Sequence, residues 1–164
     1  MKIAHLEEHI KDYEASIKTV VEKKIIWETK TRSQILTTLN SIVNQYDIGW
    51  CVQELSWINT NEAINITFNS FPKDLIEKTN QIPTYQFIQG GALVFSQTYS
   101  GNVNVFILFP MLDNAMETEV DTDLAIYEPQ NITEKIIIEK VDEFLKKMIE
   151  WEVPAINKKV GYLK

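Results

Sequence analysis

Residues 91–110, which read GALVFSQTYSGNVNVFILFP, constrain the fold of this chain more than any other stretch. They hold two apolar runs rich in β-branched and aromatic residues, at 92–99 and 102–109. Such runs favour β-strands, and Gly101 between them supplies the positive φ that a tight hairpin turn needs. We therefore predict a central antiparallel hairpin at 91–110.

The side chains of this hairpin are apolar on both faces near its base. A two-residue turn places Leu93 opposite Leu108. One face then carries Val94, Val103, Val105, Ile107 and Phe109, and the other carries Leu93, Phe95, Phe106 and Leu108. A strand pair that is apolar on both faces must be covered on both faces. We expect the helices at the two ends of the chain to supply this cover.

The N-terminal region, residues 1–46, is predicted to be helical because positions 2–46 contain neither glycine nor proline. Apolar side chains, with one lysine, recur there at alternating four- and three-residue steps, the spacing of a packed helix face: Leu6, Ile10, Tyr13, Ile17, Val20, Lys24 and Trp27. The pattern resumes one residue out of phase at Ile35, Leu39, Ile42 and Tyr46.

Two arrangements of this region are compatible with the spacing. One continuous helix would be roughly 65 Å long at about 1.5 Å per residue, would project from the domain and would need a partner. A break near 29–33 would instead give two helices that fold back on each other. The phase shift favours a break or bend at that point.

The remaining chain completes a single α+β domain over 1–164. An antiparallel sheet of about five or six strands is expected within 47–128, with a short helix at 72–78 that starts at a proline. Asn131, followed three residues later by Glu134, is typical of a helix start. We predict an amphipathic helix at 130–152, packed on the sheet, and a tail at 153–164. This order of elements loosely resembles two architectures, the ligand-sensing domains of GAF/PAS type and the small acidic secretion chaperones.

The charge balance excludes several classes of function. With a net charge of −7, the chain has no general attraction for nucleic acid or for anionic lipid, so neither nucleic acid nor a membrane is an expected partner. Cys51 is the only cysteine, which rules out an intrachain disulfide and is typical of the cytoplasm. The charged N-terminus does not resemble a secretory leader, and we expect a cytoplasmic protein.

Two clusters of polar residues are candidate metal or partner sites. His5, Glu8 and His9 match the H-x-x-E-H pattern of a zinc motif, in which two histidines lie one helical turn apart. No third ligand follows at a suitable spacing, so this match predicts adventitious metal binding rather than catalysis, and no cofactor is expected. In a second stretch, every other residue is acidic: Glu117, Glu119, Asp121 and Asp123. On a strand these carboxylates would share one face, where they would either bind a basic partner or protect a sheet edge from aggregation.

Aromatic residues supply a third candidate site, a ligand pocket between sheet and helix. Its predicted lining is Trp50 or Trp57 with Tyr85, Phe87 and Phe95. The chain lacks the phosphate-binding and nucleophile motifs of common enzymes. We therefore predict a non-enzymatic protein-binding or scaffold module, a homo-oligomer that self-associates through its N-terminal helices. The alternative is a small-molecule sensor that uses the aromatic pocket.

Overall fold

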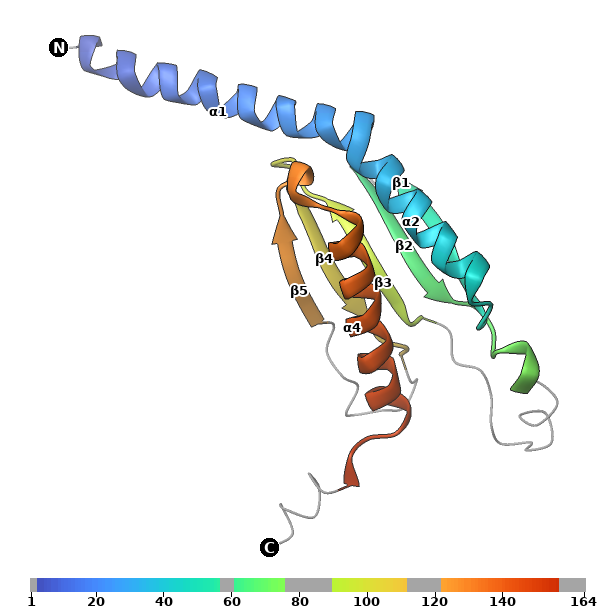
Figure 1. Ribbon diagram of the computed structural model, residues 1–164. Coiled ribbons are helices and arrows are strands. Elements are labelled where there is room, and N and C mark those ends of the chain that lie inside the picture. Colours follow the sequence, from blue (N-terminus) through green and yellow to red (C-terminus); the bar gives the residue numbers. More distant parts are fainter. Residues whose placement is uncertain (1–2, 57–60, 76–89, 112–121, 157–164) are drawn as a thin grey trace, which may run out of the picture.

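The computed structural model describes residues 3–56, 61–75, 90–111 and 122–156, and it shows an α+β fold (Figure 1). Its helices are α1 (Leu6–Ile26), α2 (Arg32–Gln45) and α4 (Glu134–Glu152), and its strands are β1 (Trp50–Ser56), β2 (Glu62–Phe68), β3 (Ala92–Gln97), β4 (Val103–Leu108) and β5 (Thr122–Tyr127). The strands form one sheet in the order β1-β2-β3-β4-β5, each antiparallel to the next. The predicted fold class is thus confirmed, with a long N-terminal helix, a five-stranded antiparallel sheet and a C-terminal helix.

The central hairpin forms as predicted, but its register differs by one residue. The turn contains three residues rather than two, because the Thr98 amide donates to the Asn102 carbonyl at 2.8 Å and the Gly101 amide donates to the Thr98 carbonyl at 3.0 Å. Gly101 adopts a φ of 89°, the left-handed conformation that such a turn requires at this position. Leu93 therefore pairs with Ile107, and the predicted grouping of the two faces was wrong.

The shifted register collects the largest apolar side chains on one face of the sheet. Leu93, Phe95, Val103, Val105 and Ile107 are all completely buried there, together with residues of α2 and α4. Both helices therefore cover the same face, and α2 also contacts α4 directly. The expectation that the two ends of the chain would cover opposite faces was wrong.

The second face of the sheet carries a smaller apolar cluster. Ala63, Ala92 and Val94 are buried in it, and Leu55, Phe106 and Leu108 pack around them. In the described ranges, no helix lies on this face. Asn65 of β2 is also buried on this face.

The C-terminal helix begins slightly later than predicted. Thr133 is its N-cap, and its hydroxyl accepts a hydrogen bond from the Ile136 amide at 3.3 Å. Asn131 instead ends a short 3-10 turn, Pro129–Asn131. Apolar side chains spaced along one face of α4 reach the core, and they are Ile137, Val141, Phe144 and Met148.

The two helices α1 and α2 join without a break through a π-helical turn, Trp27–Thr31. In this turn the Arg32 amide donates to the Trp27 carbonyl, five residues back, which inserts one extra residue into the helix. That insertion accounts for the one-residue phase shift seen in the sequence. Figure 1 shows that the helix changes direction there, as π turns commonly cause. The bend was predicted, whereas the folded-back pair was wrong.

Several predicted features lie partly or wholly outside the described residues. Within the range predicted as a helix, 72–78, the structure has a 3-10 turn at Lys73–Leu75. Residues 76–78 of that range lie outside the described residues. Parts of the region predicted for the sheet, at 57–60, 79–89 and 112–121, and the predicted tail from 157 onward also lie outside the described residues. Among the helices that are described, none combines the length and the apolar character needed to cross a membrane.

Candidate protein-binding surface

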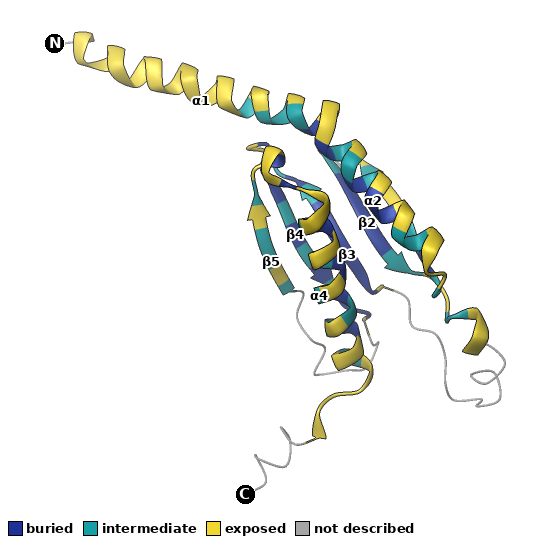
Figure 2. Cartoon of the chain, viewed as in Figure 1, coloured by how far each residue is buried: buried dark blue, intermediate teal, exposed yellow. Residues whose placement is uncertain are grey.

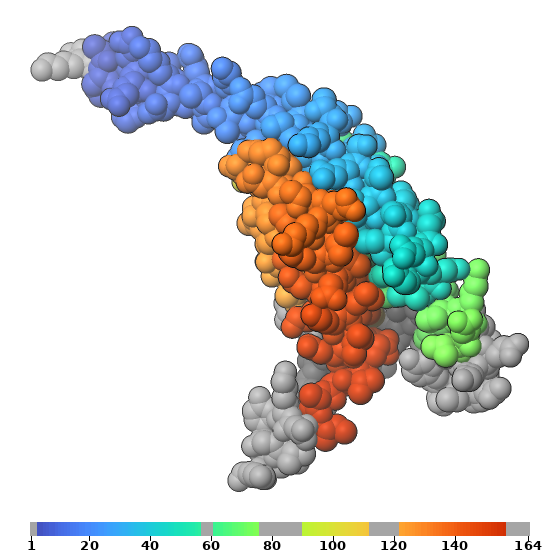
Figure 3. All heavy atoms as spheres, in the orientation of Figure 1, coloured from blue at the N-terminus to red at the C-terminus, as the bar shows by residue number. Residues whose placement is uncertain are grey.

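The N-terminal half of α1 carries apolar side chains that face solvent. Four of these residues lie on one face of α1, and Ile3 lies in the 3-10 turn, Ile3–His5, that leads into it. We call the five together the α1 stripe: Ile3, Leu6, Ile10, Tyr13 and Ile17. Their exposed fractions range from 43% to 67%, and α1 buries none of its residues. Figure 2 shows the exposed turns continuing to the N-terminal end, and in Figure 3 they form an arm that leaves the body of the domain. Apolar surface of this extent commonly marks an interaction site.

The helical conformation of α1 does not itself require these apolar residues. Acidic side chains in the first turn complement the helix dipole. The Lys11 ammonium also lies 3.5 Å from the Glu7 carboxylate, one turn away. Polar residues at the stripe positions would preserve these interactions. The stripe is therefore explained neither by helix formation nor by the core of its own domain.

The C-terminal end of α1, by contrast, is held against the domain. The Lys23 ammonium donates to the Asn102 side-chain carbonyl at 2.9 Å and lies 3.7 Å from the Glu128 carboxylate. A Cβ atom on Gly101 would lie only 2.7 Å from the Cβ atom of Lys23. The hairpin turn therefore approaches α1 more closely than any side chain at position 101 would allow.

The π turn that follows, together with Arg32 at the start of α2, is attached to the rest of the fold at two places. The buried Thr31 hydroxyl donates to the Pro129 carbonyl at 2.8 Å. Arg32 donates to Glu54 at 2.9 Å, and its Nε lies 3.3 Å from Glu62. The hydrogen bond to Glu54, aided by the nearby carboxylates, raises the pKa of the Arg32 guanidinium above its ordinary value. These contacts fix the direction in which α1 leaves the domain.

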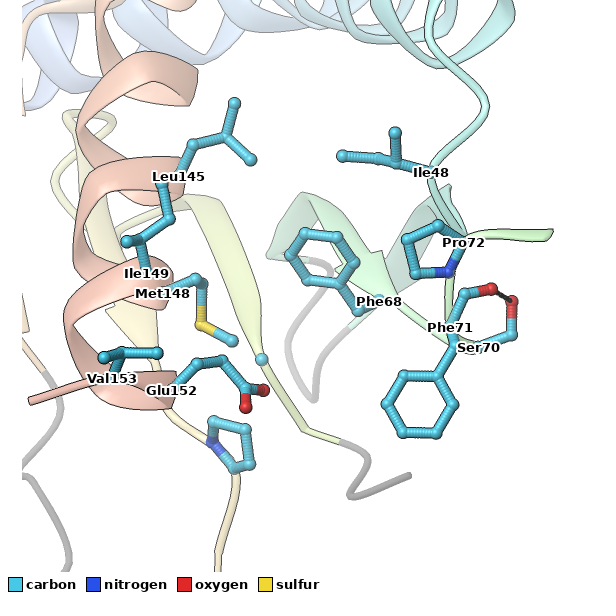
Figure 4. A pocket seen from close by; sticks show the side chains of 12 residues that line it. Ile48, Phe68, Ser70, Phe71, Pro72, Leu145, Met148, Ile149, Glu152 and Val153 are labelled. Atoms are coloured by element: carbon cyan, nitrogen blue, oxygen red, sulfur yellow. Dashed lines mark hydrogen bonds between the residues drawn. The ribbon is translucent and has the colours of Figure 1, made fainter. Parts of the chain in front are cut away.

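A separate apolar pocket of about 340 Å³ lies at the C-terminal end of α4 (Figure 4). Figure 4 shows Leu145 and Met148 on α4, across the cavity from Phe68 and Ile48. Its complete lining is Ile48, Phe68, Ser70, Phe71, Pro72, Gly91, Pro110, Leu145, Met148, Ile149, Glu152 and Val153. Ligand pockets usually have this apolar character with a few polar groups.

Two of the five residues predicted to line an aromatic pocket, Trp50 and Phe95, are among the described residues. Trp50 is buried, stacks on Phe68 with ring centroids 5.6 Å apart, and donates from its indole nitrogen to the Tyr46 carbonyl at 2.6 Å. Phe95 is completely buried in the core. Trp57, Tyr85 and Phe87 lie outside the described residues. Of the two that are described, Trp50 borders a hollow between α2 and α4, which shares Ile48 and Leu145 with the apolar pocket.

The candidate metal and acidic sites are both only partly described. His5 and His9 lie on the exposed first turns of the N-terminal helix. Within the described ranges, no group of three or more metal-ligating side chains is close enough to hold an ion. Of the acidic series, Asp123 is exposed on β5, and Glu117, Glu119 and Asp121 lie outside the described residues.

Sequence reasoning missed the residues that position these surfaces. Gly101 was expected in the turn, but its contact with Lys23 joins segments that are far apart in the sequence. Similarly, nothing in the local pattern around Arg32 indicates carboxylates on β1 and β2. The pocket rim could have been found in part from the sequence, because Ile149 and Val153 are apolar residues beside the polar face of α4 and are exposed.

Comparison of this chain with protein-family models, with curated proteins and with solved structures found no match in any of the three.

Proposed function

We propose that this chain is a non-enzymatic protein-binding or scaffold module that self-associates through its N-terminal helix. The observation that carries this proposal is the α1 stripe, an apolar face on a helix that extends past the sheet (Figure 1). A helix buries such a face most readily against another helix with a similar face. A second copy of the same chain supplies one.

The geometry of the arm supports a protein partner over a small ligand. The stripe runs along a convex rod, whereas small molecules bind in concave sites that bury most of their surface. A folded-back helical pair would have buried these residues within one chain. Because α1 instead continues into α2, the stripe remains accessible to another molecule.

Sedimentation equilibrium over a hundredfold range of protein concentration tests this proposal. We expect the parent chain to form a dimer or higher oligomer, and we expect Ile10→Glu with Ile17→Glu to make it monomeric. The matched control, Ala15→Glu with Thr19→Glu, places the same charges on the other side of α1 and should still associate. Far-UV circular dichroism should be alike for all three proteins. A parent chain that is monomeric at every concentration would refute the proposal.

The apolar pocket at α4 supports a second candidate, a small-molecule sensor. Its volume of about 340 Å³ falls at the lower end of the range for ligand sites, and it lies between helix and sheet as expected for such a module. A compact apolar molecule would displace water from the side chains of Leu145 and Met148, which is the main source of affinity in such a pocket.

Binding of the fluorescent apolar probe ANS tests this second candidate. We expect saturable binding by the parent chain and loss of binding in Ile149→Trp, whose indole would fill part of the cavity. Ile126→Trp adds the same side chain on the exposed face of β5 and should bind the probe normally. Equal binding by both variants would place the probe elsewhere and remove this candidate.

A further inference from the structure

The α1 stripe has the residue types of a two-stranded coiled coil. Ile3, Ile10 and Ile17 recur every seven residues at the first core position of a heptad, and Leu6 and Tyr13 occupy the second core position. β-Branched residues at the first position favour two strands in parallel coiled coils. This inference rests on the proposed self-association, and it concerns how the second copy is oriented.

The charges beside the stripe distinguish the two possible orientations. Glu7 and Glu14 occupy the e position of the heptad, on one flank of the core. His9 and Ser16 occupy the g position, on the other flank. In an antiparallel pair, each flank meets the same flank of the partner. Every register that pairs at least four of the five stripe residues with the partner's stripe then sets at least one glutamate against a glutamate.

A parallel, in-register pair avoids this repulsion, because each flank meets the opposite flank of the partner. Glu14 of one copy then faces His9 of the other, and no two acidic residues are opposed. We infer that two copies of this chain pair through α1 as a parallel, in-register coiled coil, with both globular domains at the same end of the rod.

The structure also indicates where this pairing ends. Lys24 occupies the next core position, and its ammonium lies 5.1 Å from the centroid of the Tyr99 ring of its own domain. Lys23 is bound to Asn102, and Trp27 is buried. The paired segment therefore extends from Ile3 to about Val20.

Disulfide trapping tests the orientation. In a Cys51→Ser background, Leu6→Cys and Ile17→Cys are made as separate variants and oxidised with copper phenanthroline. In a parallel, in-register pair, each introduced cysteine lies beside the same cysteine of the second chain. Each variant alone should therefore form a covalent dimer. Ala15→Cys, on the opposite side of α1, is the matched control and should remain unlinked. Circular dichroism of each reduced variant checks that α1 remains helical.

The outcomes separate this inference from the proposed function. Covalent dimers that form only when the two variants are mixed would show an antiparallel pair and overturn the inference. A parent chain that sediments as a dimer while neither variant cross-links would also overturn it. In both cases the proposed self-association would stand. A monomeric parent chain would instead remove the proposed function, and this inference with it.

Discussion

The helices α1 and α2 belong to one continuous helical segment, yet their apolar faces have opposite surroundings. Ile35 and Leu39 of α2 are completely buried against the sheet, whereas Ile10 and Ile17 of α1 are 53% and 46% exposed. Both pairs lie on one face of a helix, four residues apart in α2 and seven residues apart in α1. The difference lies in what the fold places beside them, because the sheet extends under α2 and ends near the π turn (Figure 1).

This contrast shows that an apolar stripe on a helix indicates only that another surface covers it, and not whether that surface belongs to the same chain. For α2 the partner is the sheet of the same chain, and its burial contributes to the stability of the domain. For α1 we propose that the partner is a second copy. Substitutions in the two segments should therefore affect different quantities, which are folding stability in α2 and association in α1.

The largest expected effect comes from truncating the same kind of side chain in each segment. Leu39→Ala removes a buried side chain, leaves a cavity and should reduce the free energy of unfolding by about 3 kcal/mol. Ile10→Ala should change it by less than about 0.5 kcal/mol at protein concentrations where the chain is monomeric. Urea denaturation of both variants measures the difference. Equal losses would show that α1 is buried within its own chain.

Gly101→Ala tests the contact that separates the two segments. The added methyl group would meet Lys23 at 2.7 Å, and alanine disfavours a φ of 89°. We expect a loss of about 2 kcal/mol in the free energy of unfolding. Amide hydrogen exchange near Lys23 should also become faster, because the docked end of α1 loosens. Ser100→Ala in the same exposed turn is the control, and a similar loss there would implicate the turn alone.

Thr31→Val tests the attachment of the π turn. Valine has the same shape but leaves the buried Pro129 carbonyl without the hydroxyl that donates to it at 2.8 Å. We expect a loss of about 1.5 kcal/mol in the free energy of unfolding. Thr29→Val removes a hydrogen bond of equal length to the Ile25 carbonyl, but at an exposed site, and should cost much less. Thermal unfolding of the two variants gives the comparison.

The smallest effect is expected at Arg32, which joins the π turn to the sheet through partly exposed ion pairs. Arg32→Met should lower the free energy of unfolding by at most about 1 kcal/mol, because solvent screens these charges. The loss should shrink further in high salt. Denaturation at low and high ionic strength checks this, and a larger loss that salt does not change would show a buried, unscreened pair.

The proposed binding surface and the pocket differ in how far they follow from local sequence. The spacing from Leu6 to Ile17 predicts the stripe directly, since one helical period relates all its residues. The pocket instead combines α4 residues with Phe68 of β2 and with residues that precede β1 and β3 or follow β2 and β4, and no local pattern relates these positions. Trp50 and Phe95, which we predicted to line a separate aromatic pocket, are of a type common in pockets and in cores, and the structure places both in the core.

The hairpin shows why register resisted prediction. Ser100 and Gly101 are compatible with a two-residue turn, and also with a three-residue turn that has glycine at its last position. Because side chains alternate along a strand, the single added residue exchanges the partners on both faces. The same stretch was therefore correctly predicted as a hairpin and incorrectly divided between the two faces.

The sequence by itself determined the types of element and their order, because periodicity, glycine and capping residues act over a few neighbouring positions. It also determined that the long helix is interrupted in phase near residue 29. Only the tertiary structure decided that a π turn absorbs this shift, that α2 and α4 share one face of the sheet, and that the α1 stripe stays exposed. These features depend on contacts between residues far apart in the chain, such as Gly101 with Lys23 and Thr31 with Pro129, which no local pattern encodes.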